Sequence, residues 1–128
     1  MNNMQGIYIN CRKYPFIDWI ISGRKSYETR NTNTLGRLVG KRVALIRTGF
    51  GDPVVCAMAT IRSARKVKYN EKYMRHFACI YGTEYDIRPD DYKFFYTLKN
   101  ITPVIPYKVP ENRVNHGRSY TEWEEKTK

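Results

Sequence analysis

The sequence predicts an α+β fold in which a small mixed β-barrel is flanked by helices that cover its ends. Three observations lead to this prediction. The 128 residues fit a single domain with one hydrophobic core. Strand-like segments outnumber helical ones, and the predicted order of elements is β-α-β-β-β-α-β. We expect the core at about residues 5–110 and a C-terminal tail at 111–128. An open α+β sheet is the alternative arrangement.

The first strand and the first helix are predicted to follow each other closely in the sequence. Residues 7–11 are rich in β-prone side chains. Pro15 suits the start of a helix, because the N–H that proline lacks has no helical partner there. Gly23 is expected to end the helix in a left-handed conformation. Apolar residues with helical spacing lie between them at Phe16, Trp19 and Ile20.

A strand with several charged side chains follows the helix. If residues 25–30 alternate regularly, Glu28 and Arg30 point the same way and Lys25 points to the opposite face. Charges this closely spaced are costly to bury without partners. We therefore expect them to line a polar pocket that binds a polar or anionic group. The alternative is a salt bridge on a solvated face, which contributes about 0–1 kcal/mol.

A hairpin is predicted after a polar loop at residues 31–40. Residues 43–46 form a continuous apolar run typical of a buried strand, and residues 54–61 are the longest β-like stretch. The glycines and the proline at 48–53 predict the turn between the two strands. A basic strand end follows at Arg62, Arg65, Lys66 and Lys68.

The second half of the chain is predicted to contain one helix and two strands. Apolar residues with helical spacing over 69–81, with Asn70 as N-cap, indicate a helix that ends at Gly82. Residues 93–98 are strand-like. Residues 104–105 lie between prolines, which confine them to an edge or irregular strand. The charged end of the tail is expected to fray.

The positive charge is concentrated in the N-terminal half of the chain. Residues 1–68 hold 13 basic and 3 acidic side chains, against 10 and 9 in residues 69–128. Each Lys or Arg placed beside a phosphate releases condensed counterions, which makes binding stronger and dependent on salt. The distribution therefore favours a polyanionic partner; a charge that serves only solubility is the alternative.

Cysteine and histidine content argues against disulfide and metal sites. Cys11, Cys56 and Cys79 are odd in number and far apart, which is typical of reduced thiols in a cytosolic protein. With only His76 and His116 available, no metal-ligand spacing is present. No apolar run approaches the roughly 18 to 20 residues that span a bilayer. We expect a cytoplasmic protein with no membrane contact, metal or cofactor.

Residues 14–30, together with the strand at 43–46, resemble the ASCH family. The signature of this family is a helix that ends in Gly-x-Lys-Thr or Gly-x-Lys-Ser, followed by a strand with Glu and Arg. The residues that fill those places are Gly23, Lys25, Ser26, Glu28 and Arg30. The predicted order of elements matches over about residues 5–110, although the specific motif covers only the first third of the chain. ASCH proteins resemble the PUA domain, so the resemblance implies a small PUA-like β-barrel with flanking helices.

The resemblance implies a cleft that binds RNA or a nucleotide, because PUA-like domains commonly bind RNA. In such a cleft Glu28 accepts from the amine edge of a base, Arg30 meets a phosphate or carbonyl group and Lys25 supplies a positive charge. The basic strand end would extend the positive surface. The residues expected to bind the ligand are Arg24, Lys25, Ser26, Glu28, Arg30, Arg62, Arg65 and Lys66.

A hydrolase is the alternative function that the resemblance implies. One branch of the family resembles an amidohydrolase that removes the acyl group from acetylated cytidine, in which a lysine at the position of Lys25 works with a threonine three residues later and a distant glutamate. Here Glu28 stands at the threonine's position, and Glu84 is the candidate for the glutamate. Lys25, Glu28 and Glu84 are thus the candidate catalytic residues. Thr29 or Ser26 would have to supply the missing hydroxyl.

Two further functions stay open at this point. Other family members are described as metal-dependent ribonucleases, but the carboxylates of Glu28, Glu84 and Asp86 have no recognisable ligand spacing. A module whose basic face binds an acidic protein is also consistent with the charge. Residues 116–119 are compact and polar, and they are expected either to cap the cleft or to form a plain C-terminal turn.

Overall fold

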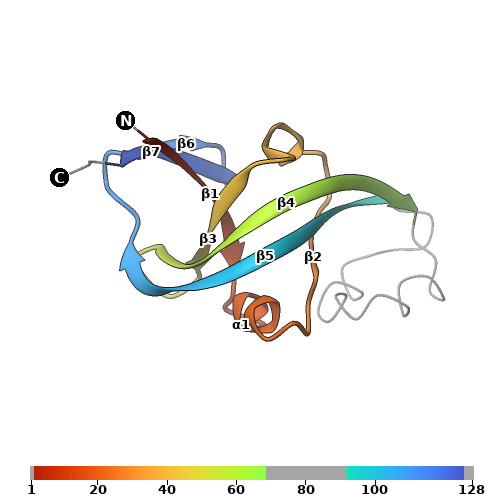
Figure 1. The fold of residues 1–128 in the computed structure, drawn as a ribbon, viewed down its shortest axis with the longest axis horizontal. Helices are drawn as coiled ribbons and strands as arrows, with labels where there is room; N and C mark the ends of the chain where they lie inside the picture. Colours follow the sequence, from red (N-terminus) through yellow and green to blue (C-terminus); the bar gives the residue numbers. More distant parts are fainter. Residues whose placement is uncertain (1, 69–91, 126–128) are drawn as a thin grey trace.

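Strands dominate the computed structural model, which describes residues 2–68 and 92–125 (Figure 1). The elements are β1 (Asn2–Asn10), α1 (Phe16–Ile21), β2 (Tyr27–Arg30), the 3₁₀ helix η1 (Gly36–Leu38), β3 (Arg42–Thr48), β4 (Val54–Lys68), β5 (Tyr92–Lys108), β6 (Val114–His116) and β7 (Tyr120–Glu125). The helix predicted at 69–81 lies outside the described residues, as do Glu84, Asp86, His76 and Cys79.

The seven strands form one sheet in the order β2-β5-β4-β3-β1-β7-β6. β1 and β3 pair in parallel, and the other neighbouring strands are antiparallel. In the described part of the chain no pairing joins the edge strands β2 and β6, so the sheet is not closed into the predicted barrel and corresponds to the open sheet given as the alternative. β2 has four residues and pairs with residues 94–97 of β5, and within 2–68 and 92–125 no other strand pairs along that edge.

Two hydrophobic clusters lie on opposite faces of the sheet and share β3. Val43 and Leu45 pack into one cluster, whereas Ala44 and Ile46 pack into the other. All four side chains are fully buried. The continuous apolar run predicted at 43–46 is thus a strand covered on both faces.

α1 is short and is held by two buried side chains, Ile17 and Ile20. Gly23 has φ +83°, a conformation that strains residues with a Cβ, and this confirms the predicted helix stop. The backbone N–H of Lys25 then donates to the carbonyl of Trp19 at 3.0 Å. The chain therefore turns directly from α1 into β2. The short connection places the charged residues of β2 close to β1, where Arg30 bonds to the carbonyl of Tyr8.

β4 and β5 form a long twisted ribbon that crosses the molecule (Figure 1). The predicted hairpin of β3 and β4 is confirmed, and β4 extends beyond residue 61 to include the basic residues. Beyond Leu98, β5 pairs with β4 alone and shows register shifts. Pro103 and Pro106 lie in this part, where a missing N–H costs little, so the predicted irregular edge strand is confirmed.

The C-terminal segment belongs to the sheet. β7 pairs with β1 from Tyr120 to Glu125, so the fraying predicted for this end is wrong over these residues. The cause is Trp123, whose 5% exposed side chain packs with Ile46 in the second cluster. A Cβ built on Gly6 of β1 would lie 2.5 Å from an Ile46 methyl carbon and 3.2 Å from the Trp123 ring. Glycine therefore permits the close packing of β1, β3 and β7 at this point.

Candidate functional site

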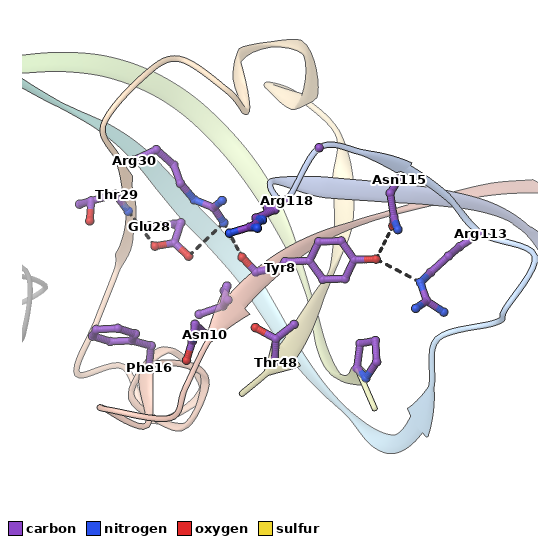
Figure 2. A pocket seen from close by; sticks show the side chains of 13 residues that line it. Tyr8, Asn10, Phe16, Glu28, Thr29, Arg30, Thr48, Arg113, Asn115 and Arg118 are labelled. Carbon is purple, nitrogen blue, oxygen red and sulfur yellow. Dashed lines mark hydrogen bonds and ion pairs between the residues drawn. The ribbon is translucent and has the colours of Figure 1, made fainter. Parts of the chain in front are cut away.

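A cleft of about 620 Å³ lies between the N-terminal strands and the C-terminal segment (Figure 2). Its walls come from β1, α1, β2, the end of β3, the turn before β4, and the segment around β6. The lining residues are Tyr8, Ile9, Asn10, Phe16, Glu28, Thr29, Arg30, Thr48, Pro53, Arg113, Asn115, Gly117 and Arg118. The cleft thus combines parts of the chain that are about one hundred residues apart.

Glu28 and Arg30 line one side of the cleft and point the same way, as predicted. One Glu28 oxygen accepts the backbone N–H of Thr29 at 2.8 Å, and the other lies 3.6 Å from Nη2 of Arg30. Nη2 of Arg30 also donates to the carbonyl of Tyr8 at 2.6 Å. The side chains of Glu28 and Arg30 are only 9% and 18% exposed. Each charge therefore compensates for much of the cost of burying the other.

A second group of hydrogen bonds joins β1 to the C-terminal segment. The Tyr8 hydroxyl donates to Oδ1 of Asn115 at 2.5 Å and accepts from Nε of Arg113 at 3.2 Å. Nη1 of Arg113 also donates to the carbonyls of Val109 and Pro110, at 3.4 and 3.0 Å. Arg113 is thereby held in one orientation. Figure 2 shows Arg113 and Asn115 on one side of the Tyr8 ring, with Glu28 and Arg30 on the other.

The segment 116–119 contributes two lining residues, Gly117 and Arg118. Of the two predicted alternatives, the structure therefore favours a cap on the cleft. The Arg118 side chain is exposed and makes no hydrogen bond or ion pair with the described part of the chain. His116 does not line the cleft: its Nε2 lies 2.8 Å from a Glu122 oxygen, and its ring stacks on Tyr120 at 4.6 Å.

The lining has an excess of positive charge. Three guanidinium groups, on Arg30, Arg113 and Arg118, face one carboxylate, on Glu28. The ring of Phe16 adds an apolar wall, and amide and hydroxyl groups add neutral donors and acceptors. Such a lining can hold a ligand that has an anionic group and a flat apolar part.

Lys25 is buried but does not line the cleft. Its side chain is among the few charged ones in the interior, at 2% exposure, and Nζ lies 4.8 Å from the centroid of the Phe16 ring. Arg24 lies over the Trp19 ring at 4.3 Å, and Ser26 is exposed, with its carbonyl accepting the N–H of Leu98. Regular strand geometry starts only at residue 27. The alternation used for the prediction therefore applies to Glu28 and Arg30, not to the residues before them.

Arg62, Arg65 and Lys66 are exposed on β4 and do not line the cleft. Arg65 pairs with Phe95 and Lys66 with Phe94, so these two neighbours point to opposite faces of the sheet. Nζ of Lys66 lies 4.5 Å from the Tyr92 ring. The three residues predicted as one extension of the positive cleft are thus divided between two faces.

No group of three or more His, Cys, Asp and Glu residues that could hold a metal occurs within 2–68 and 92–125. Cys11 and Cys56 are free thiols. Burial raises the pKa of the Cys11 thiol and of the Cys56 thiol, which keeps both in the protonated, poorly nucleophilic form. Among the described residues, no helix has the length and the apolar character needed to cross a membrane.

The sequence pattern did not indicate three lining residues: Tyr8, Arg113 and Asn115. Arg118 lies in the segment 116–119, for which a cap on the cleft is one of the two predicted alternatives. Tyr8 lies in a strand with no distinguishing motif, and Arg113 and Asn115 lie in the predicted tail. The available signal was the polar and basic character of residues 113–118. That signal does not reveal a partner, because Tyr8 and Asn115 are 107 positions apart in the sequence.

Solved structures of an ASCH protein from Zymomonas mobilis have the same fold. One matches with a TM-score of 0.63 and 18% identity over 81% of this chain and 73% of that chain. A serine-to-alanine variant of that protein matches with a TM-score of 0.60 and 15% identity, over 93% of this chain and 88% of that chain. A tyrosine-to-phenylalanine variant matches with a TM-score of 0.53 and 17% identity, over 81% of this chain and 76% of that chain. No protein-family model and no curated protein matches the sequence. The chain therefore has the fold of an ASCH domain, in agreement with the resemblance of its helix–strand motif.

Proposed function

We propose that the cleft binds RNA or a nucleotide. The observation that carries the proposal is the lining itself: one cleft combines an aromatic ring, one carboxylate and three guanidinium groups. Its volume of about 620 Å³ lies in the usual range of small-molecule sites. The ASCH fold supports the proposal, because the PUA-like domains that it resembles commonly bind RNA.

Each part of a nucleotide has a complementary group in the cleft. The Phe16 ring offers a surface on which a base can stack, an interaction that contributes about 1–3 kcal/mol per base. The Glu28 carboxylate can accept hydrogen bonds from the amine edge of a base through Oε2, which lies 3.6 Å from Arg30, since the Thr29 N–H bonds to the other oxygen. The guanidinium groups can bind phosphate oxygens through charge-assisted hydrogen bonds.

The proposal is tested by replacing the Phe16 ring with another apolar side chain of similar volume. We expect wild-type protein to bind a short labelled single-stranded RNA with an affinity that falls as salt rises. Phe16→Leu should weaken binding by about 1 kcal/mol or more, because leucine cannot stack on a base. Fluorescence anisotropy titrations at several salt concentrations measure both effects.

Phe50→Leu is the matched control, since Phe50 is an exposed phenylalanine that does not line the cleft. This variant should bind as the wild type does. The proposal is wrong if the wild type binds neither RNA nor nucleotides, or if Phe16→Leu and Phe50→Leu have the same effect.

A hydrolase acting on a modified nucleoside or on RNA is the second candidate. One observation favours it: the Glu28 carboxylate points into the cleft, where it can act as a general base. The side chain of Thr29, the next residue of the strand, projects to the other side of β2 (Figure 2). The candidate catalytic groups of this alternative are Lys25, Glu28 and the Thr29 hydroxyl, and of these three the Glu28 side chain is the one that points into the cleft. Glu84, a further candidate, lies outside the described residues.

Incubation of the purified protein with acetylated cytidine and with single-stranded RNA, each with and without divalent metal, tests the hydrolase. The hydrolase would be supported if the wild type forms product and Glu28→Gln forms none while it still binds RNA. Substrates that stay intact through a long incubation would exclude these two reactions and leave a binding function.

A further inference from the structure

We infer that Arg118, on the C-terminal side of the cleft, is the site of an anionic group, and that the ligand of this cleft therefore carries a phosphate. The inference rests on the proposed function and deepens it, because it names nucleotides and phosphodiesters as ligands rather than free nucleosides. The three guanidinium groups of the cleft differ in how far they are already engaged within the protein.

Arg30 is committed to the protein. Its Nη2 bonds to the carbonyl of Tyr8 at 2.6 Å and lies 3.6 Å from Glu28. Its positive charge is therefore balanced by the one carboxylate of the lining. The charges of Arg30 and Glu28 cancel each other. The other two positive groups of the lining, on Arg113 and Arg118, therefore have no anion to balance them in the cleft lining.

Arg113 is a fixed charge. Its Nε and Nη1 donate to the Tyr8 hydroxyl and to the carbonyls of Val109 and Pro110, which hold the guanidinium in place but are neutral acceptors. Its charge therefore still contributes to the electrostatic potential of the cleft. A positive potential in a concave site raises the local concentration of anions.

Arg118 has the opposite character, since its guanidinium has no hydrogen bond or ion pair with residues 2–68 or 92–125. It follows Gly117, whose φ of +63° makes the turn between β6 and β7, and Figure 2 shows it reaching from this turn toward the side of the cleft that Arg30 lines. Like charges gathered in one cleft repel each other, and an anion among them removes that cost. A phosphate suits the planar guanidinium, which can bind two of its oxygens at once.

The test compares ligands that differ only in phosphate. Calorimetric titrations would use ribonucleosides, their 5′- and 3′-monophosphates, and inorganic phosphate, with the wild type and with Arg118→Ala, Arg118→Lys and Arg37→Ala. Arg37 is an exposed arginine of η1 that does not line the cleft, so its replacement controls for the loss of one positive charge.

We expect the wild type to bind monophosphates at least about tenfold more tightly than nucleosides, the effect of one charge-assisted hydrogen-bonding pair. Arg118→Ala should remove this difference and leave nucleoside binding unchanged. Arg118→Lys should retain part of it, because lysine keeps the charge but not the planar geometry. Arg37→Ala should bind all ligands as the wild type does.

Three results would overturn the inference: nucleosides and monophosphates bind the wild type equally well, Arg118→Ala weakens both to the same degree, or Arg37→Ala has the effect of Arg118→Ala. In each case the proposed binding of nucleic-acid components stands. Inorganic phosphate that binds as tightly as the monophosphates would overturn the assignment of a nucleotide ligand. Absence of binding to nucleosides, monophosphates and RNA alike would instead contradict the proposed function itself.

Discussion

The two sides of the cleft hold their charges in different ways. On the β2 side, Glu28 and Arg30 are largely buried and bond to each other and to the backbone. On the C-terminal side, Asn115 and Arg118 are exposed, and Arg118 makes no polar contact within the described residues. Both sides nevertheless face the same cleft (Figure 2).

The difference separates charges that stabilise the fold from charges that are open to a ligand. A buried and bonded charge cannot be removed without leaving its partner unpaired in a low-dielectric environment. An exposed side chain contributes little to the free energy of unfolding, because it is solvated in both states. Substitutions of Glu28 or Arg30 should therefore affect stability first, whereas substitution of Arg118 should affect binding.

The largest expected effect concerns the packing that attaches β7 to the sheet, outside the cleft. Trp123→Ala removes a side chain that packs with Ile46 and leaves a cavity in the second cluster. We expect it to lower the free energy of unfolding by about 3–5 kcal/mol. Urea denaturation measures this. Val114→Ala, at a 58% exposed position of β6, is the control and should change stability by less than about 0.5 kcal/mol. A small effect of Trp123→Ala would mean that β7 adds little to the core.

Arg30→Ala comes next. It leaves the buried Glu28 carboxylate without its cation and the Tyr8 carbonyl without its donor, so we expect a loss of about 3 kcal/mol in urea denaturation. Lys108→Ala breaks the pair with Asp52, whose side chains are 76% and 70% exposed, and should cost less than about 1 kcal/mol.

A double variant sharpens this result. Arg30→Ala combined with Glu28→Gln removes the unpaired charge as well, so it should be more stable than Arg30→Ala alone. If the double variant is less stable than the single one, the Glu28–Arg30 pair is not the source of the loss.

Tyr96→Phe should have a smaller effect on stability, and it tests the hydrogen bonds that join β5, the neighbour of β2, to the loop after β2. Tyr96 pairs with Glu28 in the sheet, and its hydroxyl donates to Oδ1 of Asn33 at 2.8 Å and accepts the N–H of Leu35 at 3.2 Å. Loss of the hydroxyl should cost about 1–2 kcal/mol, because buried polar groups in the loop lose their partner. Urea denaturation near neutral pH measures this loss.

The same tyrosine predicts a dependence on alkaline pH. Burial raises the pKa of Tyr96 above its ordinary value of 10.0, so the folded state binds the phenol proton more tightly than the unfolded state does. This contribution is complete below about pH 10 and is lost as pH rises further. Stability should therefore fall above about pH 10, and less steeply in Tyr96→Phe. Equal slopes would show that the phenol is not responsible.

The smallest expected change in stability belongs to Arg118→Ala. Because the side chain is exposed and makes no polar contact with the described chain, the free energy of unfolding should stay within about 0.5 kcal/mol of the wild type. The same variant is expected to lose the preference for phosphorylated ligands. A destabilisation comparable with that of Arg30→Ala would contradict the distinction between the two sides.

Local patterns predicted the elements that depend on neighbours in the sequence. The left-handed Gly23, the common direction of Glu28 and Arg30, and the strand at 43–46 follow from backbone sterics and from strand periodicity, which act over a few residues. The direction of Lys25 does not follow from alternation, because the chain between Gly23 and β2 is not yet a regular strand.

The cleft could not be assembled from such patterns. Tyr8 meets Arg113 and Asn115 only because β7 pairs with β1 and carries the preceding segment across the sheet. That pairing depends on Trp123, Gly6 and Ile46 packing together, a condition set by shape in three dimensions. For the same reason the open edges of the sheet were not evident from the strand pattern.

The amino-acid sequence by itself determined that this chain is rich in strands, that it carries a helix–strand motif resembling that of the ASCH family, and that closely spaced charges follow its first helix. Tertiary structure alone decided which charges share a cleft. The physical reason is that periodicity and turn preferences are local properties of the chain. Whether Arg118 faces Glu28 and Arg30 depends instead on strand pairing and close packing between residues far apart in sequence.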